Sequence, residues 1–466
     1  MPVPQSGRIP PAGRTKAPLK MNALLVFFLG FTFLRSFSNG VDRLYNINLS
    51  STLSFTAIVV GLVVAWHMRR VRIHRRLFTL LMCLSAFAVA CGLSFVVNAF
   101  DTGSIFDRYA ASYEILRYTY LFMFVILVSA VYRSPSFCLN VHRVFISLLF
   151  LMSAIGLVQH LTGHAELASP YDKVARVAGL SAHPVSFSLE LVLTFCICEL
   201  SRRKLRLPVR HFHILVYLFF LVALILAASR TGVALLGVTF GIFLLAQRPS
   251  LLPAFAAAFA VVMWISPFGE SFSELRSVPD YILSGEYKVW DWRTAPTSFH
   301  WRIHHWYELS MLALERPMIG YGPGQVVLYS PFSLLAHSQF VETFFETGVL
   351  GLISFAVFWF SLPLAAMSDR QQLVVSYGRQ SAEVGTLHFW LAMFAGVTLV
   401  ALFDDSFNRE TLAFSYLIVS MFVVLAQPQA VTERNFRSPY SPIAMTAGRG
   451  SQHWEAEELP EPQSGR

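Results

Sequence analysis

The chain has 466 residues, of which 55% are hydrophobic and only 14% are charged. Soluble domains carry about 25% charged residues, so this composition excludes an ordinary soluble protein. The formal net charge is +9, but the basic residues gather in a few short loops. We therefore predict no nucleic-acid partner.

Apolar runs recur along nearly the whole chain, and most are long enough to cross a bilayer core of about 30 Å as a helix. The pattern predicts an all-α polytopic membrane protein with about 12 transmembrane helices. The predicted spans are residues 21–38, 51–66, 77–100, 115–132, 142–161, 184–200, 212–228, 231–247, 251–267, 340–366, 386–403 and 410–426.

Basic residues are unevenly divided between the two sides of the membrane that these spans define. The N-terminal segment and the loops 67–76 and 201–211 fall on one side, and each loop carries five Lys or Arg residues. Loops on the other side are neutral or acidic, as in FDTGSIFDRYAASYE (100–114). The positive-inside rule makes the basic side cytoplasmic. This predicts two cytoplasmic termini and an external loop over residues 268–337.

The domain organisation follows from these segments. Residues 1–20 form a basic cytoplasmic N-terminus, and residues 21–426 form one membrane domain. The first apolar run has no clear small-residue cleavage site and is expected to act as a signal anchor. Residues 427–466 are rich in Pro, Ser, Gly and Glu, which predicts a disordered cytoplasmic tail.

The external loop is too long to be a plain connector. We predict an amphipathic helix over 302–316 that ends at Pro317. Its predicted apolar stripe is Ile303, Trp306, Met311 and Leu314, and its polar face is Arg302, His305, Glu308 and Arg316. Gly320, Gly322 and Gly324 then permit positive φ and close approach of the backbone to a ligand. Their amides are candidate anion donors.

Short motifs in and beside this loop occur in a distinctive order. They are Arg302-x-x-x-Trp306, Pro317-x-x-Gly320-Tyr321-Gly322-Pro323-Gly324, Ala336-His337 and Glu346-x-Gly348-x-x-Gly351, preceded by RVAGLSAHPVSFS (176–188) and ASRTGVAL (228–235). Together they resemble the O-antigen ligase and polysaccharide polymerase superfamily. That family usually has His-Asn where this chain has His337-Ser338.

The resemblance implies a glycosyltransferase of the bacterial inner membrane with its active site on the periplasmic side. Its donor would be a saccharide on undecaprenyl diphosphate and its acceptor a glycan hydroxyl. No metal or cofactor is implied; membrane lipid, a chain-length regulator and a flippase are expected partners. The stretch AHSQFVETFFETG (336–348) favours polymerisation into an exopolysaccharide or O-antigen. Ligation to the lipopolysaccharide core is the alternative.

Three residues are the catalytic candidates. Arg302 and Arg230 present planar, bidentate donors suited to a diphosphate leaving group. His337 offers a neutral imidazole that can accept the proton of the acceptor hydroxyl. The substrate-binding candidates are Arg176, His183, Trp306, Tyr321, Gly322, Gly324, Glu342 and Glu346. Glu342 and Glu346 lie one turn apart, and we expect them to pair with an arginine such as Arg230.

Simpler readings remain open at this stage. Arg230 can reach the lipid headgroups from a helix end, Arg302 can contact anionic lipid, and His337 can be a polar residue at a helix end. His300 and Glu308 would lie about 12 Å apart along a helix, which argues against one metal centre with His304. A transporter is the rival class, but the chain lacks two similar halves and its arginines gather at the outer edge.

Overall fold

The computed structural model describes residues 24–35, 38, 49–68, 75–101, 105–132, 134–163, 176–179, 181, 183–265, 269–288, 298–330, 333–367, 381–403 and 411–426. The chain divides into two units, Met1–Pro428 and Gln429–Arg466, and every described residue belongs to the first. The predicted basic N-terminus and the predicted disordered tail lie outside the described residues.

The described residues form α-helices and two short 3-10 helices, with no β-strand among them. An unlabelled helix, Leu24–Arg35, comes first. The labelled α-helices are α2 (Leu49–Met68), α3 (Arg75–Phe100), α4 (Arg108–Val131), α5 (Phe137–Leu161), α6 (Pro184–Lys204), α7 (His211–Leu226), α8 (Arg230–Gln247), α9 (Leu252–Ile265), α10 (Gly269–Ser284), α11 (Ser298–Ala313), α12 (Val326–Tyr329), α13 (Gln339–Met367), α15 (Ala382–Phe403) and α17 (Thr411–Leu425). The 3-10 helices are η1 (Pro249–Leu251) and η2 (Glu286–Lys288).

Seven of the described helices are long and apolar enough to cross a membrane. Five shorter apolar helices accompany them, among them Leu24–Arg35, Ser51–Trp66 and His211–Leu226. Each predicted span overlaps one of these helices, so the all-helical membrane architecture is confirmed. The count of twelve crossings remains a prediction, because the shorter helices fall below the length that a bilayer core of about 30 Å requires.

Helix α6 is the central element of the bundle. It packs against α5, α7, α8, α15 and α17. Almost all of its residues from Pro184 to Ser201 are buried. Ser186, Ser188 and Thr194 on this helix are all buried. Small side chains of this kind let neighbouring helices approach closely within a membrane, which is why a helix of modest hydrophobicity occupies the centre.

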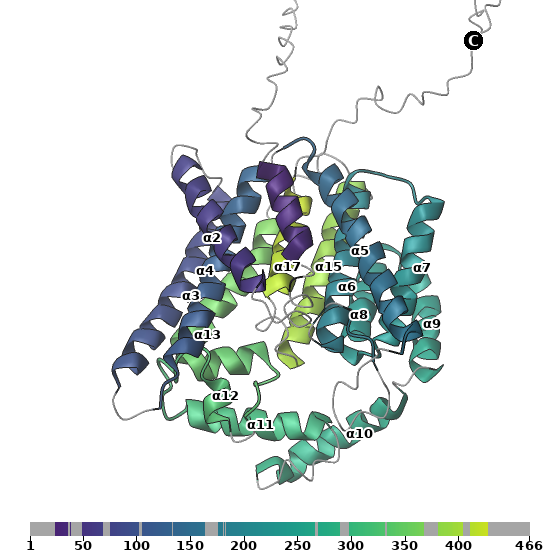
Figure 1. The fold of residues 1–466 in the computed structure, drawn as a ribbon. Helices are drawn as coiled ribbons and strands as arrows, with labels where there is room; N and C mark the ends of the chain where they lie inside the picture. Colours follow the sequence, from purple (N-terminus) through teal and green to yellow (C-terminus); the bar gives the residue numbers. More distant parts are fainter. Residues whose placement is uncertain are drawn as a thin grey trace, which may run out of the picture. The chain divides into compact units, whose positions relative to one another are not determined.

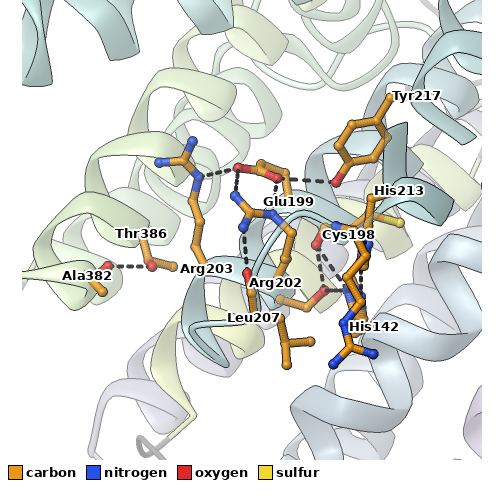
Figure 2. A network of polar contacts seen from close by, with 12 residues as sticks. His142, Cys198, Glu199, Arg202, Arg203, Leu207, His213, Tyr217, Ala382 and Thr386 are labelled. Atoms are coloured by element: carbon orange, nitrogen blue, oxygen red, sulfur yellow. Dashed lines mark hydrogen bonds and ion pairs between the residues drawn. The ribbon is translucent and has the colours of Figure 1, made fainter. Parts of the chain in front are cut away.

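Hydrogen bonds at the C-terminal end of α6 define one end of the bundle. Lys204 Nζ donates to the carbonyl of Val424 at 3.0 Å, near the end of α17, and Arg206 pairs with Glu383 at the start of α15. Figure 2 shows Glu199 accepting from Arg202 and Arg203, with Tyr217 donating to it at 3.3 Å. The loop that we predict to be cytoplasmic therefore lies at this end.

The described part of the predicted external loop lies at the opposite end of the bundle. In Figure 1, α10, α11 and α12 lie together beyond the ends of the longer helices. Asn98, near the end of α3, donates to the carbonyl of Gly320 at 3.1 Å, and Arg302 of α11 donates to the carbonyl of Phe403, the last residue of α15, at 2.9 Å. Helix α15 therefore runs from the first end of the bundle to this one.

Candidate functional site

Helix α11 carries the first part of the candidate site, but its buried face differs from the predicted one. Met311 and Leu314 are 48% and 58% exposed, while Leu309 and Ala313 are fully buried. His300, His304 and His305 share that buried face. The predicted apolar stripe is wrong because these histidines find partners inside the loop and can therefore be buried. His305 Nε2 lies 2.8 Å from Ser330 Oγ, His300 Nε2 lies 3.3 Å from Ser277 Oγ, and His304 Nδ1 contacts the Tyr287 carbonyl.

Helix α13 is broken near its start. Gly348 has φ 64° and ψ −164°, so Gln339–Met367 consists of two helical pieces joined at this residue. A residue with these angles cannot continue the helical hydrogen bonds, and the carbonyls and amides on both sides of the break need other partners. Glycine alone adopts this conformation readily.

The segment 317–322 supplies those partners. The amides of Tyr321 and Gly322 donate to the carbonyls of Phe345 and Glu346 at 3.0 and 2.8 Å. In return, the amide of Val349 donates to the carbonyl of Pro317 at 2.7 Å. A Cβ atom on Gly320 would lie 2.5 Å from the carbonyl oxygen of Phe345. The close approach that the glycines permit is therefore between two parts of the same chain.

Glu346 is tied to the same glycine segment. Its Oε1 atom accepts a hydrogen bond from the amide of Gly324 at 2.7 Å, and its side chain is buried. The amides of Gly322 and Gly324, which are candidate anion donors by sequence, are thus both directed at Glu346 in this structure. Glu342, one turn earlier, is also buried and lies within electrostatic range of Glu346.

Two charged residues of α4 lie near Glu342 and Glu346 and were not recognised from the sequence. Glu114 and Arg117 form an ion pair, and both lie within electrostatic range of Glu346. We assigned Glu114 to a loop, whereas α4 begins at Arg108 and places it inside a helix. Arg117 thus lies close to Glu346, and the expected pairing of the two glutamates with Arg230 stays a prediction.

The end of α3 anchors the segment before the glycines. Asn98 Oδ1 accepts from Arg316 at 2.7 Å, and Asp101 pairs with the same guanidinium at 2.7 Å. Ser94 Oγ donates to the Glu346 carbonyl at 2.8 Å. Gln325 and Asp107 exchange two hydrogen bonds of 2.9 Å between the Gln325 side chain and the Asp107 backbone. No motif marks α3 or α4 in the sequence, so these supports were missed.

Tyr321 has a fixed position within the same segment. Its ring stacks on Phe345 with centroids 4.8 Å apart, and its hydroxyl donates to Glu315 at 2.8 Å. Burial, together with the hydrogen bond to Glu315, raises the pKa of Tyr321 to about 12. The phenol therefore stays protonated and serves as a hydrogen-bond donor.

His337 lies at the entrance of α13. Its backbone has φ 52°, and its imidazole meets the Trp301 ring edge to face with centroids 5.2 Å apart. On one side of His337, the carbonyl of Ala336 accepts from the indole of Trp306 at 2.6 Å. On the other side, Ser338 precedes the first residue of α13. The imidazole is thus held between α11 and the start of α13.

Ser338 explains how the departure from the usual His-Asn pattern is tolerated. Its Oγ atom lies 3.5 Å from the amide of Val341, and its carbonyl accepts from the amide of Glu342 at 3.0 Å. Ser338 therefore occupies the N-cap position of α13. Serine and asparagine are equally favoured there, so the substitution keeps the local helix start.

His305 is the second histidine near this point. Trp301 stacks on it with centroids 5.8 Å apart, and His337 acts on it electrostatically. Burial, with smaller contributions from His337 and His304, lowers the pKa of His305 to about 3. His305 is therefore neutral at any ordinary pH and packs as an uncharged ring.

The arginine candidates lie at one end of the helices α8 and α15. These helices run antiparallel: Gly396 faces Leu235 near one end, and Gln247 meets His388 near the other. Arg230 is the first residue of α8 and is exposed. Arg302 of α11 lies next to the end of α15, because its NH1 group donates to the carbonyl of Phe403, the last residue of α15. Arg230 and Arg302 are therefore at the same end.

The two earlier motifs meet at this end of the bundle. The amide of Val177 donates to the Leu226 carbonyl at 3.3 Å, and a Cβ atom on Gly232 would lie 2.6 Å from Ser188. His183 caps α6 by accepting from the Val185 amide at 3.2 Å. The N-termini of α6 and α8 thus run side by side, next to Arg176 and Arg230. Helix N-termini carry partial positive charge and favour anions.

These observations define a multi-pass, all-helical membrane protein whose candidate site lies at one end of its helices. Residues 215–356 match the sequence model of the O-antigen ligase family. The predicted resemblance to the O-antigen ligase and polysaccharide polymerase superfamily is confirmed by this match. It includes Arg230, Arg302, Tyr321, His337 and Glu346, and it supports a role of the ligase or polymerase type. Among curated proteins, none matches the chain.

Proposed function

We propose that the protein transfers a saccharide from undecaprenyl diphosphate to a hydroxyl of an acceptor glycan at the outer face of the bacterial inner membrane. The observation that carries this proposal is the position of His337 at the entrance of α13, at the bundle end that also holds Arg302 and Arg230. A lipid diphosphate keeps its tail in the bilayer and its sugar outside. Its reacting bond therefore lies at such an entrance.

The arginines suit the leaving group. Negative charge on the diphosphate grows as the glycosidic bond breaks, and a guanidinium can meet two phosphate oxygens at once. Arg230 is exposed at the N-terminus of α8, where the helix dipole adds to its charge. Arg302 uses NH1 for the Phe403 carbonyl, which fixes the guanidinium beside the end of α15.

His337 suits the other half of the reaction. A neutral imidazole accepts the proton of the acceptor hydroxyl while the hydroxyl oxygen bonds to the anomeric carbon. The bond between that carbon and the diphosphate breaks, and undecaprenyl diphosphate leaves with the electron pair. The N-cap at Ser338 and the bond from Trp306 to Ala336 keep the imidazole in place.

Polymerisation is the reaction that we favour, with an exopolysaccharide or O-antigen as product. Ligation of the finished glycan to the lipopolysaccharide core is the second candidate, and the family match supports both types. In a deletion strain, loss of the long glycan with an intact core indicates a polymerase. Carrier-linked chains that accumulate without reaching the core indicate a ligase.

The direct test uses purified protein in nanodiscs with a carrier-linked repeat unit as the substrate. We expect longer carrier-linked chains and released undecaprenyl diphosphate, without added metal or cofactor. Labelled carrier that moves across a vesicle membrane without any saccharide transfer would instead identify a transporter. The same preparation shows whether a chain-length regulator changes the product length.

A further inference from the structure

Trp301 stands beside the candidate base, although no motif includes it. Its ring meets the His337 imidazole at 5.2 Å with the planes 87° apart. The same ring stacks on His305 with the planes 28° apart. His305 is fully buried, whereas Trp301 and His337 are only partly buried. The buried His305 thus fixes the orientation of the Trp301 ring, which remains partly accessible next to the His337 imidazole.

The neighbouring Trp306 has a different role. Its indole nitrogen donates to the Ala336 carbonyl at 2.6 Å, and its ring packs near Phe299 and Phe403 with centroids 6.2 and 6.0 Å away. These contacts fasten the backbone before His337 to α11 and to the end of α15. Trp306 is therefore a positioning residue, and the ring that contacts the imidazole belongs to Trp301.

Gln339 adds a polar atom two residues after His337. The side chain is 2% exposed, and its Nε2 atom reaches Thr343 Oγ1 only at 3.5 Å. Its Oε1 atom is buried and has no hydrogen-bond partner among the described residues. Buried carbonyl oxygens in folded proteins are almost always paired, so this atom calls for a donor from a ligand or from water.

We propose that Trp301 and Gln339 form a saccharide subsite that holds the acceptor sugar with its reactive hydroxyl at His337. The subsite rests on the proposed function and names residues for its acceptor side. A pyranose has an apolar C–H face that packs on an aromatic ring, and hydroxyl groups around its rim that donate to a carbonyl oxygen. The ionised diphosphate diester of a lipid-linked saccharide carries no donor for the Gln339 oxygen, and a hydrocarbon chain forms no hydrogen bond. A saccharide meets both requirements.

The binding test needs no lipid carrier. The probe is the lipid-free oligosaccharide released from the host's carrier-linked repeat by mild acid and then radiolabelled. Full-length protein in nanodiscs is compared with Trp301→Ala, Trp301→Phe and Gln339→Met by equilibrium dialysis. Losing the ring or the amide oxygen should weaken binding roughly 5-fold each, the scale of one aromatic contact or one hydrogen bond. Trp301→Phe keeps a ring and should stay within about 2-fold.

Trp66 provides the matched control, since it is 64% exposed and lies on α2. Trp66→Ala should bind the oligosaccharide like the wild type. Binding that is unchanged in both Trp301→Ala and Gln339→Met overturns the subsite. Should Trp301→Ala fail to insert into the membrane, Gln339→Met carries the test alone, because methionine is similar in size to glutamine.

Steady-state transfer assigns the subsite to the acceptor. Both variants should raise KM for the lipid-free acceptor and leave KM for the carrier-linked donor unchanged. An equal rise in both constants contradicts the acceptor assignment. Wild-type protein that binds the oligosaccharide but never transfers one from the carrier contradicts the proposed function and leaves the saccharide subsite standing.

Discussion

The backbone amide of Gly324 donates a hydrogen bond of 2.7 Å to the Oε1 atom of Glu346. Gly324 belongs to the segment that we predict to be external, and Glu346 to the first piece of α13, just before its break at Gly348. The bond therefore joins the loop that carries α11 to the helix whose entrance holds His337.

Replacing Gly348 by alanine should destabilise the protein. The residue has φ 64°, and an added Cβ would overlap the Met318 carbonyl carbon. The left-handed conformation alone costs about 1–2 kcal/mol for a residue with a side chain, and the overlap adds to it. Gly385→Ala is the control, because a Cβ there meets nothing within 4 Å. Thermal unfolding in detergent should show a lower midpoint for Gly348→Ala only; equal midpoints would contradict the packed break.

Substitutions of Ser338 test whether this residue, which stands where the family usually has asparagine, acts as the N-cap of α13. Ser338→Asn should retain activity, since asparagine caps a helix as well as serine does. Ser338→Ala removes the cap and should cost about 1 kcal/mol in helix stability, with lower transfer activity because the imidazole next to it is less firmly held. If Ser338→Asn and Ser338→Ala lose activity equally, the hydroxyl itself takes part in the reaction.

Arg302→Lys and Arg230→Lys test the diphosphate contacts. Lysine keeps the charge but loses the planar fork, so a contact formed in the transition state should weaken by about 1.5–3 kcal/mol. That corresponds to a fall in transfer rate of roughly 10- to 150-fold. Arg143 is an exposed residue near the start of α5, so Arg143→Lys is the control and should leave the transfer rate unchanged. Wild-type rates in both arginine variants would assign these side chains to lipid headgroups.

The low pKa of His305 predicts that the folded loop around α11 becomes less stable in acid. The folded protein binds a proton at this site only near pH 3, whereas the unfolded chain binds one near pH 6.5. The unfolded state therefore holds more protons as the pH falls from 6.5, and the free energy of unfolding drops by up to about 1.4 kcal/mol per pH unit. His305→Gln should reduce this slope. Hydrogen exchange in α11 between pH 7 and pH 5 measures it, and identical slopes in both proteins would refute the assignment.

Labelling of introduced cysteines tests the orientation. Ser284 and Val209 are exposed at opposite ends of the described structure, Ser284 in the loop that we predict to be external and Val209 in the loop after α6. A membrane-impermeant maleimide applied to intact spheroplasts should modify Ser284→Cys and spare Val209→Cys. The native cysteines give little background, because four of the five are buried and Cys83 is half-buried. The reverse pattern would invert the topology and the proposed location of the site.

Hydropathy placed an apolar helix within each predicted span, and seven of these helices are long enough to cross a membrane. The boundaries were less accurate: α4 begins at Arg108 and α5 at Phe137, each several residues before the predicted start. Their first turns are fixed by caps and loop contacts that hydropathy does not register. The break at Gly348 was not predicted either, since hydrogen bonds from residues far along the chain make it.

The site was only partly predictable for a similar reason. Motif order led us to propose His337, Arg302 and the glycine segment, but it could not reveal the backbone hydrogen bonds from Tyr321 and Gly322 to α13. Asn98 of α3 and Asp107, the N-cap of α4, support that segment by hydrogen bonds to Gly320 and Gln325, and no motif marks either helix. The buried face of α11 was missed because histidine counts as polar by sequence, whereas hydrogen bonding inside the loop allows it to be buried.

The rate of saccharide transfer by purified His337→Gln tests the central claim most directly. Glutamine preserves hydrogen bonding but cannot accept the proton, so the variant should insert and bind the carrier while transferring at least ~100-fold more slowly. His305→Gln should keep the wild-type pH profile of transfer, because His305 stays neutral until about pH 3. A His337→Gln protein that transfers at the wild-type rate with an unchanged pH profile would contradict the role of His337 as the base.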